Sequence, residues 1–266
     1  MYYPRSYWYR PDEDAADRIS EAYRRFVLRD HVRFVQRALE SADSKELVLD
    51  VGCGGGLFLR MLAERGYAVM GLDWSESAAR IAWSHNRVPA VRASLPDAPL
   101  GAGSCRAITM FHVLEHLHEP VPYLKSAHRL LGPNGKLIVQ VPNAASWQFL
   151  LLGERWNGLD VPRHLFDYRG ADIEKLLEKC HFEVLTKKHF SLRDNPAGLA
   201  TSLAPALDPM ARRLRGIEES GGQKLLKDGV YFSLVLAALP FTLLEASCRA
   251  GSTIMIEARK IETKNP

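Results

Sequence analysis

The sequence predicts an α/β fold built on a doubly wound parallel sheet. Three observations predict it: short apolar strand-like runs alternate with helix-like runs, the first such strand ends in a glycine-rich turn, and an acidic residue ends the second strand. Strands that alternate with helices of this length form a parallel sheet covered on both faces. The 266 residues suit one large α/β domain with additions.

Each element follows from a local pattern. Apolar residues recur at helical spacing over 12–40, and two further helices are expected over 57–66, closed by Gly66, and over 75–86, capped by Ser75. The expected strands are 46–51, 67–73, 88–93, 106–111 and 136–141, followed by a helix over 170–180 and a strand over 181–190. We therefore divide the chain into an N-terminal helical lid (1–44), a core (45–190), a helical cap (191–251) and a final core strand with a tail (252–266).

Composition narrows the functional classes. The chain is 47% hydrophobic and 25% charged with a net charge of +4, and its basic residues are scattered along expected helices, so no nucleic-acid partner is expected. The four cysteines form no C-x-x-C pair, and the first residues lack an apolar signal-peptide core, which together predict a cytoplasmic protein with reduced thiols. The aromatic arm YYPRSYWYR (2–10) is expected either to cover the site or to pack loosely.

One apolar segment raises the question of membrane contact. Residues 230–244 read VYFSLVLAALPFTLL, which is shorter than the roughly 20 residues of a transmembrane helix and is interrupted by Pro240. We expect no transmembrane segment here. A buried helix of the cap is the favoured interpretation, and contact with a membrane surface is the alternative.

The glycine run carries the first functional signal. Asp50 ends the first strand, and the run GCGGG (52–56) follows where a helix should begin, so the backbone can approach a ligand at the helix N-terminus. Asp73 ends the second strand, where a carboxylate can bind the two hydroxyls of a ribose. A dinucleotide site would need a glycine at position 57, which is Leu57, and no G-K-[ST] follows for a P-loop. A nucleoside-like ligand without a pyrophosphate is expected.

Four motifs in order, LVLDVGCGGG, GLDWS, FHVLEHLHEP and RLLGPNGKLIVQVPN, resemble those of class I S-adenosylmethionine-dependent methyltransferases. The resemblance covers about 45–190 and is greatest to small-molecule enzymes such as the ubiquinone-biosynthesis O-methyltransferases. It implies a Rossmann-like, seven-stranded sheet whose last strand is antiparallel, with S-adenosyl-L-methionine across the carboxyl ends of the strands. Cys105-Arg106 replaces the Phe-Asp pair usual before the fourth strand.

The same resemblance implies a set of cofactor contacts. Gly52, Cys53 and Gly54 would line the methionine portion, which Phe111 and His112 would also meet. Asp73 would hold the ribose, and Trp74 would pack on the adenine. The family commonly has an acid near the adenine amino group where this chain has Ser94 and Leu95. The expected cofactor-binding residues are Asp50, Gly52, Cys53, Gly54, Gly56, Asp73, Trp74, Ser94, Leu95, Phe111 and His112.

A hydroxyl acceptor needs a base, or a metal that lowers the pKa of the acceptor. His116 after the fourth strand, and Asp160 and His164 after the fifth, are the candidate catalytic residues, although each also suits a supporting role in the site. In the ubiquinone O-methyltransferases the stretch M-E-M-L-E-H can supply metal ligands, and His112, Glu115 and His116 occupy the corresponding places here. A divalent metal is therefore an alternative, but no metal ligand is expected.

The predicted function is methyl transfer from S-adenosylmethionine to a hydroxyl of a small-molecule acceptor. The apolar residues of the cap suggest that this acceptor is hydrophobic. A non-catalytic S-adenosylmethionine-binding regulatory protein is the second hypothesis. A zinc peptidase is the third, because His112-x-x-Glu115-His116 matches an H-x-x-E-H pattern. That chemistry needs a continuous helix, whereas here the pattern overlaps a strand end and a helix is expected only from Pro120. The acceptor and the oligomeric state cannot be predicted.

Overall fold

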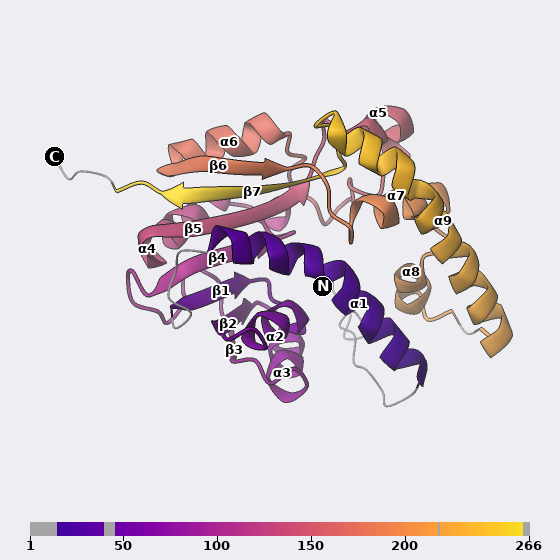
Figure 1. Ribbon diagram of the computed structural model, residues 1–266, viewed down its shortest axis with the longest axis horizontal. Coiled ribbons are helices and arrows are strands. Elements are labelled where there is room, and N and C mark those ends of the chain that lie inside the picture. Colours follow the sequence, from indigo (N-terminus) through magenta and orange to yellow (C-terminus); the bar gives the residue numbers. More distant parts are fainter. Residues whose placement is uncertain (1–14, 40–45, 218, 263–266) are drawn as a thin grey trace.

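A single seven-stranded sheet forms the centre of the computed structural model, which describes residues 15–39, 46–217 and 219–262 (Figure 1). Its strands lie in the order β3-β2-β1-β4-β5-β7-β6, and β7 runs antiparallel to both of its neighbours. The predicted fold class is confirmed. The strands are β1 (Leu47–Val51), β2 (Ala68–Asp73), β3 (Ala90–Arg92), β4 (Cys105–Phe111), β5 (Leu131–Pro142), β6 (Phe182–Lys188) and β7 (Thr253–Lys260).

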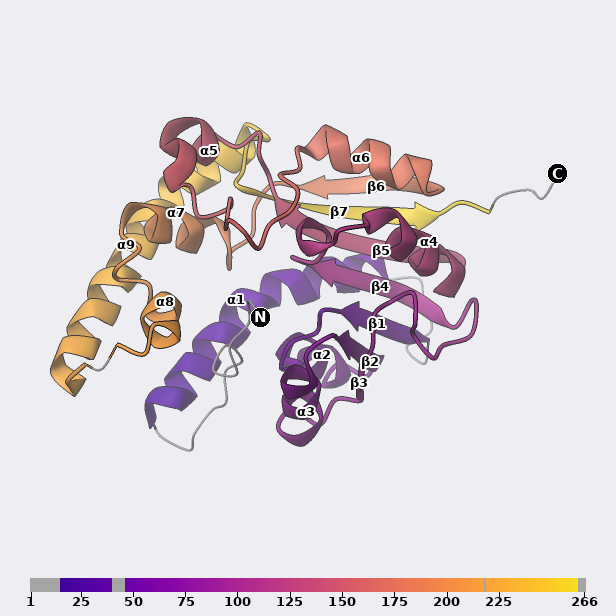
Figure 2. The same cartoon turned by 180° about the vertical axis from the view of Figure 1, so that it is seen from behind.

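Helices cover both faces of this sheet, because successive strand residues point to opposite sides. On one face, α1 (Ala15–Ala38) and α2 (Leu57–Ala63) share a core with Val48 and Ala107. On the other, α4 (Pro120–Leu130) and α6 (Gly170–Lys179) pack on Leu49 and Ile108. Accordingly α1 lies in front of the sheet in Figure 1 and α4 lies in front in Figure 2. α3 (Glu76–Ser84) lies against β2 and β3.

Loops that leave the carboxyl ends of the strands surround one edge of the sheet. The short 3-10 turn η1 (Leu114–His116) follows β4, and α4 begins at Pro120 as predicted. After β5 come α5 (Trp147–Leu152), the 3-10 turn η2 (Gly153–Arg155) and an irregular segment to Arg169. The backbone N–H of Leu165 donates to the carbonyl of Glu115 (2.7 Å), which ties this segment to η1.

The predicted insertion contains α7 (Asn195–Leu203), α8 (Pro209–Leu214) and α9 (Gly221–Ser247), all between β6 and β7. In Figures 1 and 2 these helices lie beyond the carboxyl ends of the central strands, with α9 extending away from the sheet. The division into lid, core and cap stays a prediction. The aromatic arm 2–10 lies outside the described residues.

The prediction of a buried apolar helix is wrong for most of α9. The helix has 27 residues, because Ser220 caps it through the N–H of Gln223 and it continues past Pro240, so the shortness of 230–244 no longer argues against a membrane span. Its buried side chains are few, namely Val235, Ala238, Thr242 and Glu245. Within the described ranges, α9 is the helix whose length and apolar composition would suffice to cross a membrane, and 22% of its most apolar 18-residue window is buried.

Candidate active site

The carboxyl ends of β1, β2 and β4 bring three predicted residues to one edge of the sheet. Asp50 is the penultimate residue of β1, Asp73 ends β2 and Phe111 ends β4, and β1 pairs with both other strands in parallel. Ligands of doubly wound sheets bind outside this edge, where the loops diverge. The predicted cofactor residues therefore share one location although they are far apart in sequence.

The turn after β1 requires glycine for two reasons. Gly52 and Gly56 have φ of +73° and +79°, a region that side chains other than glycine rarely adopt. A Cβ atom on Gly52 would lie 2.8 Å from the Val113 side chain, and one on Gly56 would lie 2.9 Å from that of Ala82. The glycines thus let the turn pass close under the loop after β4 and against α3.

Asp73 is fixed by the same turn. Its carboxylate accepts hydrogen bonds from the N–H of Gly54 (2.9 Å) and the N–H of Ser75 (2.7 Å), while burial raises its pKa. A carboxylate has about four acceptor positions, so two remain for a ligand such as a ribose diol. Asp50 accepts from the Thr109 hydroxyl (2.6 Å), and burial raises its pKa to about 7.

The positions of four other side chains show which of them a cofactor could contact. The Cys53 thiol is buried against Gly71, and the Leu95 side chain lies in the core, so only the backbones of these residues could meet a cofactor. Trp74 is 73% exposed beside Asp73, which suits a ring that packs on a ligand. The Ser94 hydroxyl donates to Asp97 (2.5 Å), an acid that sequence reasoning missed at the place expected to lack one.

His112 is enclosed by carboxylates. Its Nδ1 lies 3.0 Å from Glu115 Oε1 and its Nε2 lies 3.5 Å from Asp194 Oδ1, and Asp194 stands immediately before α7 of the cap. Burial alone would lower the pKa of His112, but Asp194 and Glu115 outweigh it and raise the pKa to about 9. His112 is therefore a structural cation near neutral pH and is poorly suited to accept a proton.

The charge of His112 should make stability depend on pH. Because the folded pKa of about 9 lies above the ordinary 6.5, the stabilisation is complete below pH 6.5 and is lost as the pH rises through 9. We expect a decrease of up to about 3 kcal/mol in the free energy of unfolding across this window. Denaturant titrations at several pH values measure it. The variant His112→Gln should have a flatter profile, and an unchanged slope would contradict the assignment.

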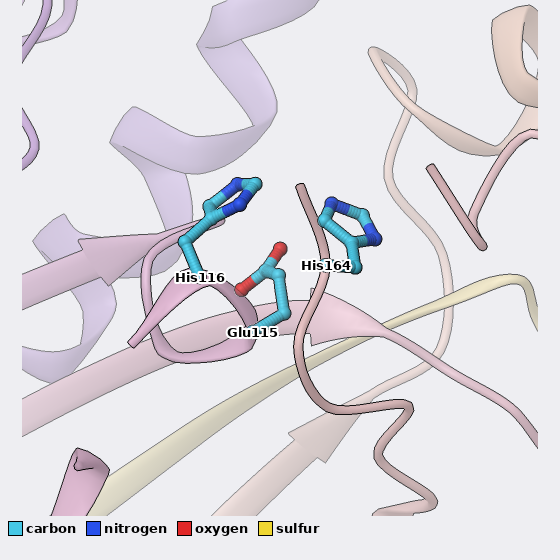
Figure 3. Close-up of side chains that lie close together, drawn as sticks. All are labelled: Glu115, His116 and His164. Atoms are coloured by element: carbon cyan, nitrogen blue, oxygen red, sulfur yellow. The ribbon is translucent and has the colours of Figure 1, made fainter. Parts of the chain in front are cut away.

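His116 of η1 and His164 of the segment after β5 lie side by side (Figure 3). The centroids of their rings are 4.7 Å apart, and Glu115 projects toward both rings. His116 Nδ1 lies 2.9 Å from the Arg163 carbonyl, and His164 Nδ1 lies 2.7 Å from the Gly158 carbonyl. A carbonyl only accepts, so each Nδ1 carries the hydrogen and each Nε2 is the basic atom. Burial lowers the pKa of His164, which keeps this ring neutral at pH 7.

Asp160 is engaged by a neighbour. Arg163 Nε and its terminal nitrogen donate to Asp160 Oδ1 at 3.0 and 2.7 Å, while His164 Nε2 lies 3.9 Å from Asp160 Oδ2. The terminal nitrogen also lies 2.6 Å from Asp160 Oδ2, so the ion pair engages both oxygens of the carboxylate. Of the three candidate catalytic residues, the structure thus brings His116 and His164 together and places Asp160 beside them as a supporting charge.

The zinc peptidase hypothesis fails on geometry. His112 precedes η1, a turn of three residues, and φ of His112 is +55°, so His112 and His116 do not share one face of a helix. The two imidazoles engage different partners, Asp194 and the Arg163 carbonyl respectively. The predicted alternative metal set of His112, Glu115 and His116 is not assembled for the same reason.

Comparison with known proteins places this site in a family. Residues 23–187 match a family model described as "Methyltransferase domain". The chain belongs to the methyltransferase domain family. This membership confirms the family predicted from the four motifs, with its dependence on S-adenosylmethionine.

Methyltransferase relatives among curated proteins cover part of the chain. It is 30% identical over 141 residues, 52% of each protein, to a probable S-adenosylmethionine-dependent methyltransferase of Mycolicibacterium smegmatis. It is 29% identical over 130 residues to the ubiquinone biosynthesis O-methyltransferase of Pseudomonas paraeruginosa, covering 46% of this chain and 56% of that one. The chain spans about half the length of the curated relatives that it matches.

Solved structures share the fold at lower identity. An S-adenosylmethionine-dependent methyltransferase from Archaeoglobus fulgidus has a TM-score of 0.58 and 17% identity, over 93% of this chain and 100% of that one. Geranyl diphosphate C-methyltransferase from Streptomyces coelicolor, in complex with Mg²⁺, geranyl diphosphate and S-adenosyl-L-homocysteine, has a TM-score of 0.56 and 14% identity, over 87% and 77%. These likenesses concern the fold alone.

Proposed function

We propose that this methyltransferase moves a methyl group from S-adenosylmethionine to a hydroxyl of a small-molecule acceptor. The observation that carries the proposal is the pair His116 and His164, whose tautomers are set by backbone carbonyls and which follow β4 and β5 at the sheet edge that also carries the glycine turn and Asp73. Family membership supports the methyl donor, and the histidine pair supports an acceptor that must lose a proton.

The residues at the edge of the sheet fit the methyl donor. The glycine turn lies against Asp73 through the N–H of Gly54, and the two remaining acceptor positions of Asp73 suit a ribose diol. Exposed Trp74 offers an adenine-sized apolar face. When bound, S-adenosylmethionine supplies a methyl group on a positively charged sulfur, which is already a good leaving group. The protein then has mainly to orient the acceptor and exclude water.

Methyl transfer to a hydroxyl also requires a side chain that accepts the hydroxyl proton. As the acceptor oxygen forms a bond to the methyl carbon, the carbon–sulfur bond breaks, S-adenosyl-L-homocysteine leaves and the hydroxyl proton must go to a base. A neutral imidazole with its hydrogen on Nδ1 accepts such a proton at Nε2. The lowered pKa of His164 suits this role, since the ring is unprotonated before each turnover.

Binding and transfer can be measured separately. By calorimetry we expect one site per chain, which binds either S-adenosylmethionine or S-adenosyl-L-homocysteine. With a donor labelled in the methyl group, the label should reach hydroxyl-bearing acceptors, and His164→Ala should lower transfer by about 100-fold, the size of a typical general-base contribution, without changing donor affinity. Failure to bind either nucleoside would overturn the proposal. Binding with transfer to amines or thiols alone would overturn the hydroxyl acceptor.

We further propose that the acceptor is hydrophobic and is collected at a membrane surface by α9. Leu225, Leu226 and Phe232 on α9 are 76%, 69% and 47% exposed. Leu150 and Leu151 on the adjoining α5 are exposed too, and Trp147 of α5 contacts Phe241 of α9. Exposed apolar residues along a helix suit insertion at the boundary between headgroups and acyl chains.

In flotation assays with phospholipid vesicles, we expect the unmodified protein to bind the vesicles and the double variant Leu225→Glu/Phe232→Glu to lose this binding. Absence of vesicle binding by the unmodified protein would contradict this role.

A further inference from the structure

Glu115, His116 and His164 each bring one potential ligand atom close to those of the other two (Figure 3). The three ligand atoms all lie within 4.8 Å of one another, and Glu115 is completely buried. We propose that these residues bind a divalent transition-metal ion. The site differs from the set expected by resemblance, because His164 from the segment after β5 takes the place of His112.

An unpartnered buried oxygen points to a ligand at this place. Glu115 Oε1 is paired with His112, but no described donor forms a hydrogen bond to Glu115 Oε2, which is buried. A buried carboxylate oxygen without a partner costs roughly 1–3 kcal/mol or more, so folded proteins seldom retain one. A cation bound between Glu115 and the two histidines would satisfy it.

Each of the three residues also has the outer hydrogen bond that metal ligands use. His116 and His164 donate from Nδ1 to the carbonyls of Arg163 and Gly158, and His112 holds the far oxygen of Glu115. Such outer partners fix the tautomer and the ring orientation, so that Nε2 presents its lone pair to the metal. Two histidines that only packed against each other would not need to share one tautomer or to lie next to the same carboxylate.

The donor set selects the class of metal. Two imidazole nitrogens and one carboxylate suit Zn²⁺, Co²⁺, Mn²⁺ or Fe²⁺, whereas Mg²⁺ and Ca²⁺ prefer oxygen ligands. With bonds of about 2.1 Å, bound ligand atoms lie about 3–4 Å apart, so the side chains need to close by about 1 Å. Three protein ligands leave further coordination positions open, as in catalytic metal sites.

The inference deepens the proposed function and rests on it for its role, but not for metal binding itself. An acceptor hydroxyl in an open position would have its pKa lowered by the ion. The histidines would then act as ligands and not as proton acceptors, and the proton would leave from the metal-bound hydroxyl to solvent. In the metal-bound protein this route would replace proton transfer to His164, while the acceptor stays the same.

Metal binding tests the inference without any assay of transfer. The chain is treated with chelator and titrated with Co²⁺, followed by its visible absorption, and with Zn²⁺ by competition against a chelating dye. We expect one ion per chain and, for Mg²⁺, an affinity at least about 100-fold weaker. His164→Ala and His116→Ala should each weaken Zn²⁺ binding at least about 100-fold. His85→Ala, on the exposed end of α3, is the matched control.

Every outcome bears on the inference. Absence of stoichiometric binding, tighter binding of Mg²⁺ than of Zn²⁺, or equal Zn²⁺ affinity of His164→Ala and His85→Ala would overturn it. Circular dichroism and thermal unfolding identify a variant that fails to fold, in which case His164→Gln, which keeps a polar side chain, replaces it. Donor binding by calorimetry on the same samples separates the hypotheses, since S-adenosylmethionine can bind with no metal site present, and metal can bind where the donor does not.

Discussion

Asp73→Ala is expected to weaken S-adenosylmethionine binding by at least about 100-fold. The carboxylate offers two acceptor positions toward a ribose diol, and each hydrogen bond to a charged group contributes roughly 1.5–3 kcal/mol. Losing both corresponds to a factor between about 10² and 10⁴ in the dissociation constant. Calorimetric titration of the variant with S-adenosylmethionine and with S-adenosyl-L-homocysteine measures the change.

The control must separate ligand contact from damage to the turn, because Asp73 also accepts from the N–H groups of Gly54 and Ser75. Thermal unfolding of Asp73→Ala reports that second effect. Asp172→Ala removes an exposed acid at the start of α6, paired with Arg169, and should leave donor affinity unchanged. Comparable donor affinity in the two variants would remove Asp73 from the site.

His112→Leu is expected to lower the free energy of unfolding by about 3–5 kcal/mol. The substitution leaves Glu115 and Asp194 partly or fully buried without the cation between them, and removing one member of a buried ion pair costs about that much. Equilibrium unfolding in urea measures the loss. Replacing both acids as well, by Glu115→Gln and Asp194→Asn, should recover part of it.

His85→Leu provides the comparison for this second variant, since His85 is exposed at the end of α3 and should change stability by less than about 0.5 kcal/mol. A loss below about 1 kcal/mol in His112→Leu would show that the cluster is not held by charge.

Local sequence signals predicted the glycine turn and the fold around it. Gly52 and Gly56 are set locally, by left-handed backbone angles in the turn between β1 and α2, and Asp73 is set in part locally, by the N–H of Ser75 in the turn after β2. Contacts between distant loops could not be read in the same way. Asp194 is 82 residues beyond His112, and no spacing rule relates a cap residue to a loop after β4.

The histidine pair shows the same limit. His116 and His164 were both candidates from their position after β4 and β5, but their common tautomer depends on the carbonyls of Arg163 and Gly158, which only the folded loop supplies. For α9, the apolar run 230–244 predicts a buried helix, because such runs are usually buried in soluble proteins. Composition cannot tell a core helix from one that projects beyond the core.

The placement of β7 has a consequence for how the chain is made. Lys136 in β5 pairs with Arg259 in β7, so the cap must be complete before that edge of β5 finds its partner. During synthesis, β5 would present open backbone groups for as long as it takes to add the intervening chain, and open strand edges invite pairing with other chains. The extra helices thus lengthen the interval during which that strand edge of the nascent protein is open to pairing with other chains.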